Sequence, residues 1–197
     1  EAVKGLFNGT KKLFVRANEV KQMLVAMDIA ASYGFKLVLV GASESFQIAP
    51  LLAQNKVEVI LADEHALPAT EDDDVDQPYK TAASLQKAGV LFCLNDTHDQ
   101  ARYRNLAFNA GTTVAYGLTK EEALSAITKN AAIILGVADK TGTIEVGKDA
   151  NIIISTGDVL DMRGNQLTHA FIQGRNVSLD NKGKQLYERY KYKYGIQ

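Results

Sequence analysis

The chain has 197 residues and a mass of 21.4 kDa, enough for one substantial domain or a domain with a small appendage. Its 46% hydrophobic and 23% charged residues are typical of a globular protein with a packed core, and they exclude disordered, collagen-like and coiled-coil chains. The 22 basic side chains nearly balance the 23 acidic ones, so we expect no nucleic-acid partner and no membrane partner.

Cysteine content and apolar runs exclude two further classes of protein. A single cysteine, Cys93, cannot form an intramolecular disulfide. The longest apolar runs have the length of a strand, well short of the roughly 20 residues that a membrane-spanning helix needs. Because the chain begins with Glu1 and soon enters an apolar strand pattern, we expect it to be a piece of a longer protein, which leaves the localisation open.

Strand and helix patterns alternate over the first two thirds of the chain. Short apolar runs predict strands at 13–15, 36–40, 57–61 and 90–94. Helices are predicted between them: one from a cap at Asn18 to Gly34, a short one after Gly41 and Ala42 to about Gln54, and one over 79–87 that ends at Gly89. The strand starts are about 20 to 35 residues apart, the size of a βα unit. This spacing predicts a parallel sheet with right-handed crossovers.

The last third of the chain has a different pattern. After helical material to about Gly117, Thr119 and Glu122 form a capping box that predicts a helix running to Gly136. Beyond it, short runs at 143–146, 151–154 and 170–172 predict an antiparallel sheet. The tail over 182–194 predicts an amphipathic helix, which we expect to pack on the body of the protein rather than to bind nucleic acid.

Asp96 is the main candidate for chemistry. It follows the fourth predicted strand, and parallel α/β folds place their reacting groups at the carboxyl ends of strands. A carboxylate there could bind a divalent metal or act as a base, with His98 two residues further on. The alternative is that Asp96 caps the helix that follows it.

Other polar residues carry weaker signals. His65 fits a solvated loop, and His169 fits a structural role beside a strand. The three histidines show neither HxH nor HExxH spacing, so they form no metal motif. Cys93 falls in a buried strand and is predicted to be an inert core thiol. The segment after Gly41 lacks the glycine spacing and the lysine of a phosphate-binding loop.

A resemblance to a known family rests on several motifs together. They are Gly-Val-Leu-Phe-Cys-Leu-Asn-Asp at 89–96, Gly-Leu-Thr-Lys-Glu-Glu-Ala-Leu at 117–124, Ile-Thr-Lys-Asn-Ala-Ala at 127–132 and Gly-Thr-Ile-Glu-Val-Gly-Lys-Asp-Ala at 142–150. The chain resembles the C-terminal half of an amidohydrolase-superfamily protein of the imidazolonepropionase-related branch. The resemblance implies an α/β fold that is part of a TIM-like (β/α) barrel, units five to eight with parallel strands. It also implies short β-strands of a composite β-sandwich domain and a C-terminal helix.

Three parts of the chain follow from this resemblance. Residues 1–137 would be the C-terminal half of the barrel, 138–181 the strands of the composite sandwich, and 182–197 a helical tail.

Family members hold one or two divalent metals, zinc or iron, and the aspartate on their eighth strand matches Asp96. Arg16 stands where the fifth-strand histidine is expected, and Val40 or Gly41 where the sixth-strand histidine is expected. A permanent cation repels a metal ion, so we expect no metal bound to this chain.

The resemblance implies metal-assisted attack of water on a non-peptide C–N bond of a small cyclic amide or imide. Asp96 would be the catalytic residue, and Asp96 with His98 the metal ligands that remain. Two alternatives stay open: a degenerate, non-catalytic amidohydrolase fold that serves as a binding or structural subunit, and a free-standing open α/β binding module. We expect the chain alone to hydrolyse no amide, and to pair with a missing N-terminal half or to self-associate through its open strand edges. The alternative is that its own terminal strands and the helix over 182–194 cover these edges.

Overall fold

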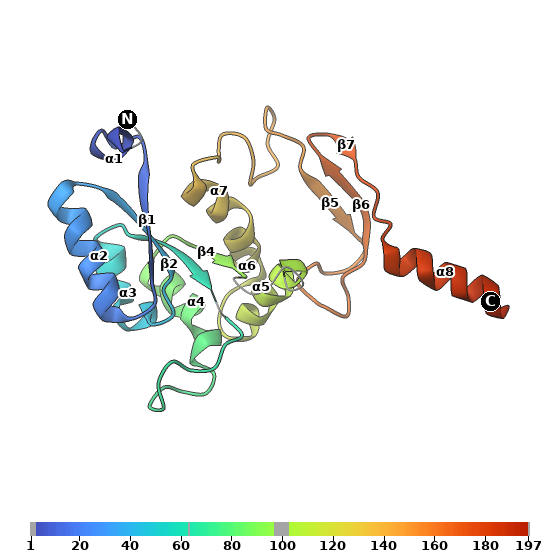
Figure 1. The fold of residues 1–197 in the computed structure, drawn as a ribbon, viewed down its shortest axis with the longest axis horizontal. Coiled ribbons are helices and arrows are strands. Elements are labelled where there is room, and N and C mark those ends of the chain that lie inside the picture. Colours follow the sequence, from blue (N-terminus) through green and yellow to red (C-terminus); the bar gives the residue numbers. More distant parts are fainter. Residues whose placement is uncertain (1–2, 63, 97–102, 197) are drawn as a thin grey trace.

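The computed structural model describes residues 3–62, 64–96 and 103–196. Its centre is a four-stranded parallel sheet with the strands side by side in chain order (Figure 1). The strands are β1 (Lys12–Ala17), β2 (Lys36–Gly41), β3 (Glu58–Ala62) and β4 (Phe92–Asn95). The predicted α/β fold with a parallel sheet is therefore confirmed.

The connections between the strands are helical, as predicted. Between the strands lie α2 (Val20–Tyr33), a 3₁₀ turn η1 (Ser45–Ile48), α3 (Ala49–Gln54) and α4 (Gln77–Ala88). The short helix α1 (Lys4–Phe7) precedes β1, and a second turn η2 (Tyr103–Asn105) and α5 (Leu106–Ala115) follow β4. The cap of α2 differs from the prediction. Its N-cap is Glu19, and the Gln22 side chain accepts hydrogen bonds from the backbone N–H groups of Asn18 and Glu19. Asn18 lies one residue too early and packs its side chain against Gly41 instead.

The two faces of the sheet are covered differently. Side chains that alternate along the strands, such as Leu39, Leu61 and Phe92, form the main core with the helices that connect the strands. The opposite face carries a smaller cluster in which Val38 and Cys93 contact Ile134. Phe14 of β1 is 46% exposed, so the second face is covered near β4 and open at β1.

The helix predicted from the capping box is two helices. The capping box is confirmed, because Thr119 and Glu122 bond to each other's backbone N–H groups at the start of α6 (Lys120–Ile127). The chain then breaks at Thr128, whose hydroxyl donates to the Leu124 carbonyl oxygen at 2.6 Å. This break turns α7 (Lys129–Leu135) so that Ile134 reaches the second face of the sheet.

Lys12 ties the end of α7 to the sheet. Its ammonium group donates to the carbonyl oxygens of Ile133 and Ile134 at 3.1 and 3.0 Å, and it forms an ion pair with Glu58 at 2.5 Å. A cation is favourable at this position because helix carbonyls carry partial negative charge at the C-terminus. The contact therefore fixes α7 against the first and third strands.

A separate antiparallel sheet follows, with β5 (Ile152–Ser155), β6 (Leu167–Ile172) and β7 (Arg175–Asn176). Two of the three predicted strands in this region are present. The third, over 143–146, is wrong: these residues form bends and a turn, and Ile144 lies exposed without a neighbouring strand in the described chain. Leu160, between β5 and β6, joins the main core, and its backbone lies so close to Gly111 that any side chain there would collide.

The C-terminal helix α8 (Lys182–Tyr194) contains no buried residue. Figure 1 shows it extending away from the β5–β7 sheet. The expectation that this helix packs on the body is therefore wrong: the described part of the body leaves the apolar side chains of α8 uncovered. No helix among the described residues combines the length and the apolarity needed to cross a bilayer.

Candidate functional site

Asp96 lies directly after β4, at the carboxyl edge of the parallel sheet. Asp96 is only 6% exposed, and the Asn109 side-chain amide donates to its Oδ2 atom at 3.4 Å. Asn109 is itself buried and lies on α5, whose N-cap is Asn105. Asp96 is therefore not the N-cap of α5, and the segment that directly follows Asp96 lies outside the described residues.

A second buried carboxylate lies at the same edge. Glu64 follows β3, the strand that pairs with β4, and is 2% exposed. Glu64 was not among the site residues predicted from the sequence. The signal was available, because Glu64 comes just after an apolar run in the same way as Asp96, and the carboxyl ends of parallel strands meet at one edge.

Helix α5 holds both strand ends. Asn109 contacts Asp96, and one turn later the Thr112 hydroxyl lies 2.8 Å from His65 Nε2. His65 is exposed, as predicted for a loop histidine. It also packs on the ring of Tyr79, with centroids 5.6 Å apart, and Tyr79 stacks on Tyr116 at 5.1 Å. The carboxyl edge of the sheet thus carries two buried carboxylates, Asp96 and Glu64. The stacked rings of Tyr79 and Tyr116 lie beside His65, which follows Glu64.

The two positions expected to hold histidines lie next to each other in the sheet. Arg16 pairs in register with Val40, and Ala17 with Gly41. Arg16 is exposed near the carboxyl end of β1. Gly41 has φ +95°, and any side chain there would collide with Asn18 Oδ1. The Asn18 side-chain amide therefore occupies the space that a ligand side chain at position 41 would need.

The described residues do not assemble a metal site. Among them, no group of three or more histidine, cysteine, aspartate or glutamate side chains is arranged to hold a metal ion. Asp96 and Glu64 are oxygen donors suited to a hard cation, but a zinc centre needs three or four ligands. His98, the other predicted ligand, lies outside the described residues. His169 lies on β6 and stacks on Phe171, which agrees with a structural role.

Cys93 lies on the second face of the sheet and is 4% exposed, as predicted for a core thiol. Burial raises the pKa of this thiol to about 12, and the negative charges of Glu64 and Glu58 add to the effect. A thiolate is the reactive form, so a thiol with this pKa is almost fully protonated near neutral pH.

We expect Cys93 to react with a soluble thiol reagent at pH 8 at least about a hundredfold more slowly in the folded chain than in urea, because both the thiolate fraction and access are reduced. The measurement is the time course of labelling by mass spectrometry, with Cys93→Ser as the blank. Equal rates in the folded and unfolded chains would contradict the burial of this side chain.

Comparison with known proteins gives a consistent result. The model of the amidohydrolase family matches residues 18–179. Over 82 residues the chain is 40% identical to an imidazolonepropionase from Thermoplasma volcanium, a match that covers 41% of this chain and 20% of that protein. The chain thus spans only part of the length of this relative.

Solved structures share the fold over most of the chain. An amidohydrolase from Thermotoga maritima superimposes with a TM-score of 0.79 and 28% identity, over 89% of this chain and 45% of that one. An adenosine deaminase from Xanthomonas campestris with bound zinc superimposes with a TM-score of 0.59 and 19% identity, over 95% of this chain and 51% of that one. The chain spans about half the length of each of these structures.

Proposed function

The chain belongs to the amidohydrolase family, and we propose that it is the C-terminal half of a hydrolase that cleaves non-peptide C–N bonds of a small cyclic amide or imide. The family match and the similarity to an imidazolonepropionase support the class of reaction. The share of the matched structures that the chain spans, 45% in the Thermotoga protein, supports the assignment as a half. The observation that carries the proposal is Asp96, buried at the carboxyl end of the last parallel strand and held there by Asn109.

Asp96 is suited to move a proton in this reaction. Hydrolysis joins a water oxygen to the carbonyl carbon and breaks the C–N bond, while one water proton passes to the departing nitrogen. A buried carboxylate that is held in place can accept the proton from water and then deliver it to nitrogen. The Asn109 amide donates to one carboxylate oxygen of Asp96 and so helps to fix the orientation of the carboxylate.

Amidohydrolases generally use divalent metals, and the described residues of this chain do not by themselves fit one. We propose that the remaining polar groups of the site come from the other half of the protein. On this view the 197-residue chain alone is inactive, and Asp96 and Glu64 are its contribution to a shared site.

The test is metal analysis and an amide hydrolysis assay on the full-length protein that contains this chain. Stoichiometric zinc, iron or manganese together with turnover of a cyclic amide or imide supports the hydrolase. A protein without bound metal and without turnover on a panel of such substrates would contradict it.

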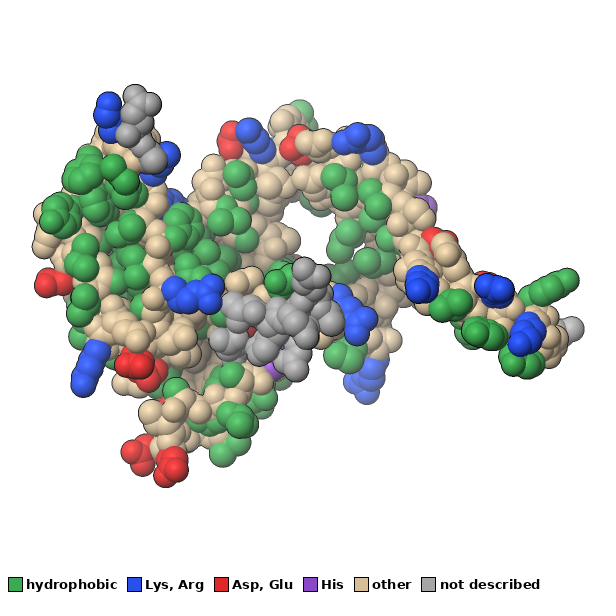
Figure 2. Space-filling view, in the orientation of Figure 1, with side chains coloured by type: hydrophobic (Ala, Val, Ile, Leu, Met, Phe, Trp, Pro, Cys, Tyr) green, Lys and Arg blue, Asp and Glu red, His purple; other side chains and the backbone are tan. Residues whose placement is uncertain are grey.

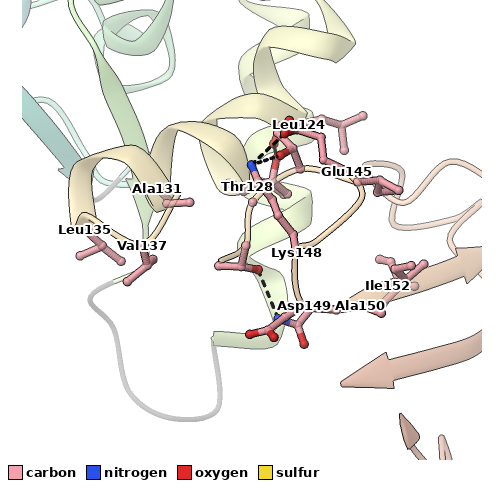
Figure 3. Close-up of a pocket in the computed structure, with 18 residues that line it drawn as sticks. Leu124, Thr128, Ala131, Leu135, Val137, Glu145, Lys148, Asp149, Ala150 and Ile152 are labelled. Atoms are coloured by element: carbon pink, nitrogen blue, oxygen red, sulfur yellow. Dashed lines mark hydrogen bonds and ion pairs between the residues drawn. The ribbon is translucent and has the colours of Figure 1, made fainter. Parts of the chain in front are cut away.

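We further propose that the parallel sheet is units five to eight of a (β/α) barrel, and that β5–β7 are part of a composite sandwich. The proposed bounds are 1–137, 138–181 for the sandwich strands and 182–197 for the tail. A hollow of about 670 Å³ supports the composite arrangement, since it lies between α6–α7 and the free edge of β5. Figure 3 shows Leu135 and Val137 on one side of this hollow and Ile152 on the other.

A degenerate, non-catalytic amidohydrolase fold is the second candidate. Arg16 favours it, since this cation lies at the carboxyl end of β1 beside the strand end closed by Asn18 and Gly41. Both features oppose binding of a cation at that edge. The absence of metal and turnover in the full-length protein, with an intact fold, is the result that this candidate predicts.

The exposed edge of the sheet at β1 indicates where another chain could bind. β1 is an edge strand, and a groove of about 400 Å³ runs between it and α2, lined by apolar side chains such as Val15, Val25 and Ile29. Unpaired edges and apolar grooves promote association with another chain. We propose that the missing half covers this groove in the full-length protein, and that a second copy covers it in the isolated chain.

The isolated chain is therefore expected to sediment above the 21.4 kDa monomer at micromolar concentration. Val25→Glu combined with Ile29→Glu places two charges in this groove and is expected to return the chain to the monomer. Val75→Glu, at an exposed position in the loop before α4 and away from the groove, is the control and is expected to leave association unchanged. A monomeric wild-type chain that binds no hydrophobic dye would contradict the proposal.

A further inference from the structure

The C-terminal helix α8 presents an apolar stripe that the described part of the chain leaves uncovered. Leu186, Tyr190 and Tyr194 are four residues apart and therefore lie on one face of the helix. The rings of Tyr190 and Tyr194 stack with centroids 6.3 Å apart, and Tyr187 borders the same face. All four side chains are exposed.

Cationic side chains lie along both sides of this stripe. Lys184 and Lys191 are seven residues apart and fall on one side, while Arg189 and Lys193 are four apart and fall on the other. Lys193 Nζ lies 5.1 Å from the centroid of the Tyr194 ring. Figure 2 shows basic side chains interleaved with hydrophobic ones along the helix.

The charge of α8 differs from that of the whole chain. From Lys182 to the end there are five basic residues and a single acidic one, Glu188, whereas the whole chain has a net charge of −1. The remainder of the chain is therefore acidic. A surface that is apolar along a strip and anionic on both sides of it would complement this helix.

We propose that α8 lies in the surface of an anionic lipid bilayer, with its Leu–Tyr stripe facing the acyl boundary and its flanking cations facing the lipid phosphates. A helix of this kind has an apolar stripe, a polar back and lysine or arginine beside the stripe. Tyrosine rings favour the headgroup level, and lysine stems reach along apolar surface while the ammonium group stays in water. An anionic bilayer attracts each such cation.

This inference does not depend on the proposed hydrolase. It departs from the expectation of no membrane partner, which rested on the net charge of the whole chain and did not consider where the charges lie. An acidic groove on a protein or a nucleic acid could use the same cations, and the test separates these cases from a bilayer.

The test is co-sedimentation of the 197-residue chain with vesicles. Phosphatidylcholine vesicles that contain phosphatidylglycerol are expected to bind the chain, and pure phosphatidylcholine vesicles to bind at least about tenfold less. Binding is expected to weaken severalfold as salt rises from about 0.05 M to about 0.5 M, since screening reaches a few ångströms at the higher value. No binding to the anionic vesicles at low salt overturns the proposal.

Matched variants separate a bilayer from other polyanions. Tyr190→Ser removes a ring from the stripe and is expected to reduce vesicle binding several-fold, whereas Tyr192→Ser, on the polar back of the same helix, is expected to leave it unchanged. Lys184→Glu with Lys191→Glu is expected to abolish binding, and Lys21→Glu with Lys87→Glu, elsewhere on the surface, to preserve it. None of these side chains is buried, so the variants are expected to keep the wild-type circular dichroism spectrum.

Two results would overturn the proposal even if vesicles bind. One is equal binding by the Tyr190 and Tyr192 variants, which would indicate a general cationic patch. The other is tighter binding to a single-stranded oligonucleotide than to anionic vesicles at the same salt concentration, which would indicate a nucleic-acid surface.

Discussion

Replacing Asp96 by asparagine in the full-length protein is expected to lower kcat/KM for its amide substrate by about a hundredfold or more. Loss of a positioned general base typically costs between about a hundredfold and ten-thousandfold. Asparagine keeps the size of the side chain, and the Asn109 amide would still face an acceptor oxygen, so the fold is expected to remain. The measurement is steady-state kinetics, with a thermal melt to check folding.

Asp28→Asn is the matched control for this variant. Asp28 is an exposed carboxylate on α2, and its replacement is expected to leave kcat/KM unchanged. The 197-residue chain alone is expected to show no turnover with or without added metal. Metal-dependent turnover by this chain, lost in Asp96→Asn, would show that the chain carries a complete site. Equal activity of the Asp96 and Asp28 variants would remove Asp96 from the reaction.

Replacing Phe92 by alanine is expected to lower the free energy of unfolding by about 3 to 5 kcal/mol, which is the range for deleting a buried aromatic ring. Phe92 is 1% exposed and packs among the helices that cover the main face of the sheet. A domain of this kind is stable by only about 5 to 15 kcal/mol, so the variant is expected to be partly unfolded at moderate temperature. Urea unfolding followed by circular dichroism measures the change.

Phe14→Ala is the control for position in the sheet. Phe14 is the same residue type on a strand of the same sheet, but it is 46% exposed on the open side. Its replacement is expected to cost less than about 1 kcal/mol, because little of the ring leaves water on folding. A loss as large as that of Phe92→Ala at a low protein concentration would mean that this side of the sheet is covered.

The sequence predicted the parallel sheet well because each strand is a continuous apolar run. The four runs at 13–15, 36–40, 57–61 and 90–94 fall within two residues of β1–β4. A strand buried on both faces needs apolar residues at consecutive positions, and few other elements of this length do. The same rule is why 143–146 failed: Thr143 and Glu145 alternate with isoleucine and valine, a pattern that forms a strand only beside a partner strand.

The helix break at Thr128 could not be read from periodicity. Apolar spacing continues through the break, because both α6 and α7 bury one stripe, yet they bury it against different surfaces. The decision depends on tertiary contacts of Ile134 and Lys12, which local propensity does not contain. The expected packing of α8 on the body was wrong for a related reason, since an amphipathic pattern predicts that a face is covered and does not say by what.

At the candidate site, the sequence identified Asp96 by its place after a strand, and the structure adds what that rule alone did not reveal. Glu64 follows β3 by the same rule but stands among several carboxylates of a polar loop, which hid it. Asn109 comes from a helix, thirteen residues further on, and only the folded chain shows that its amide meets Asp96. No sequence spacing predicts which residue of another helix or strand will contact a site residue.

The contact between Lys12 and the end of α7 has a consequence for the order in which the chain folds. It joins backbone and side-chain groups that are 121 and 122 positions apart. At a synthesis rate of about 5 to 20 residues per second, α7 is completed several seconds or more after β1. Until Ile134 has been made, first Val38 and later Cys93 lack the side chain that covers them. The second face of the nascent sheet therefore stays apolar and uncovered until α7 has been made.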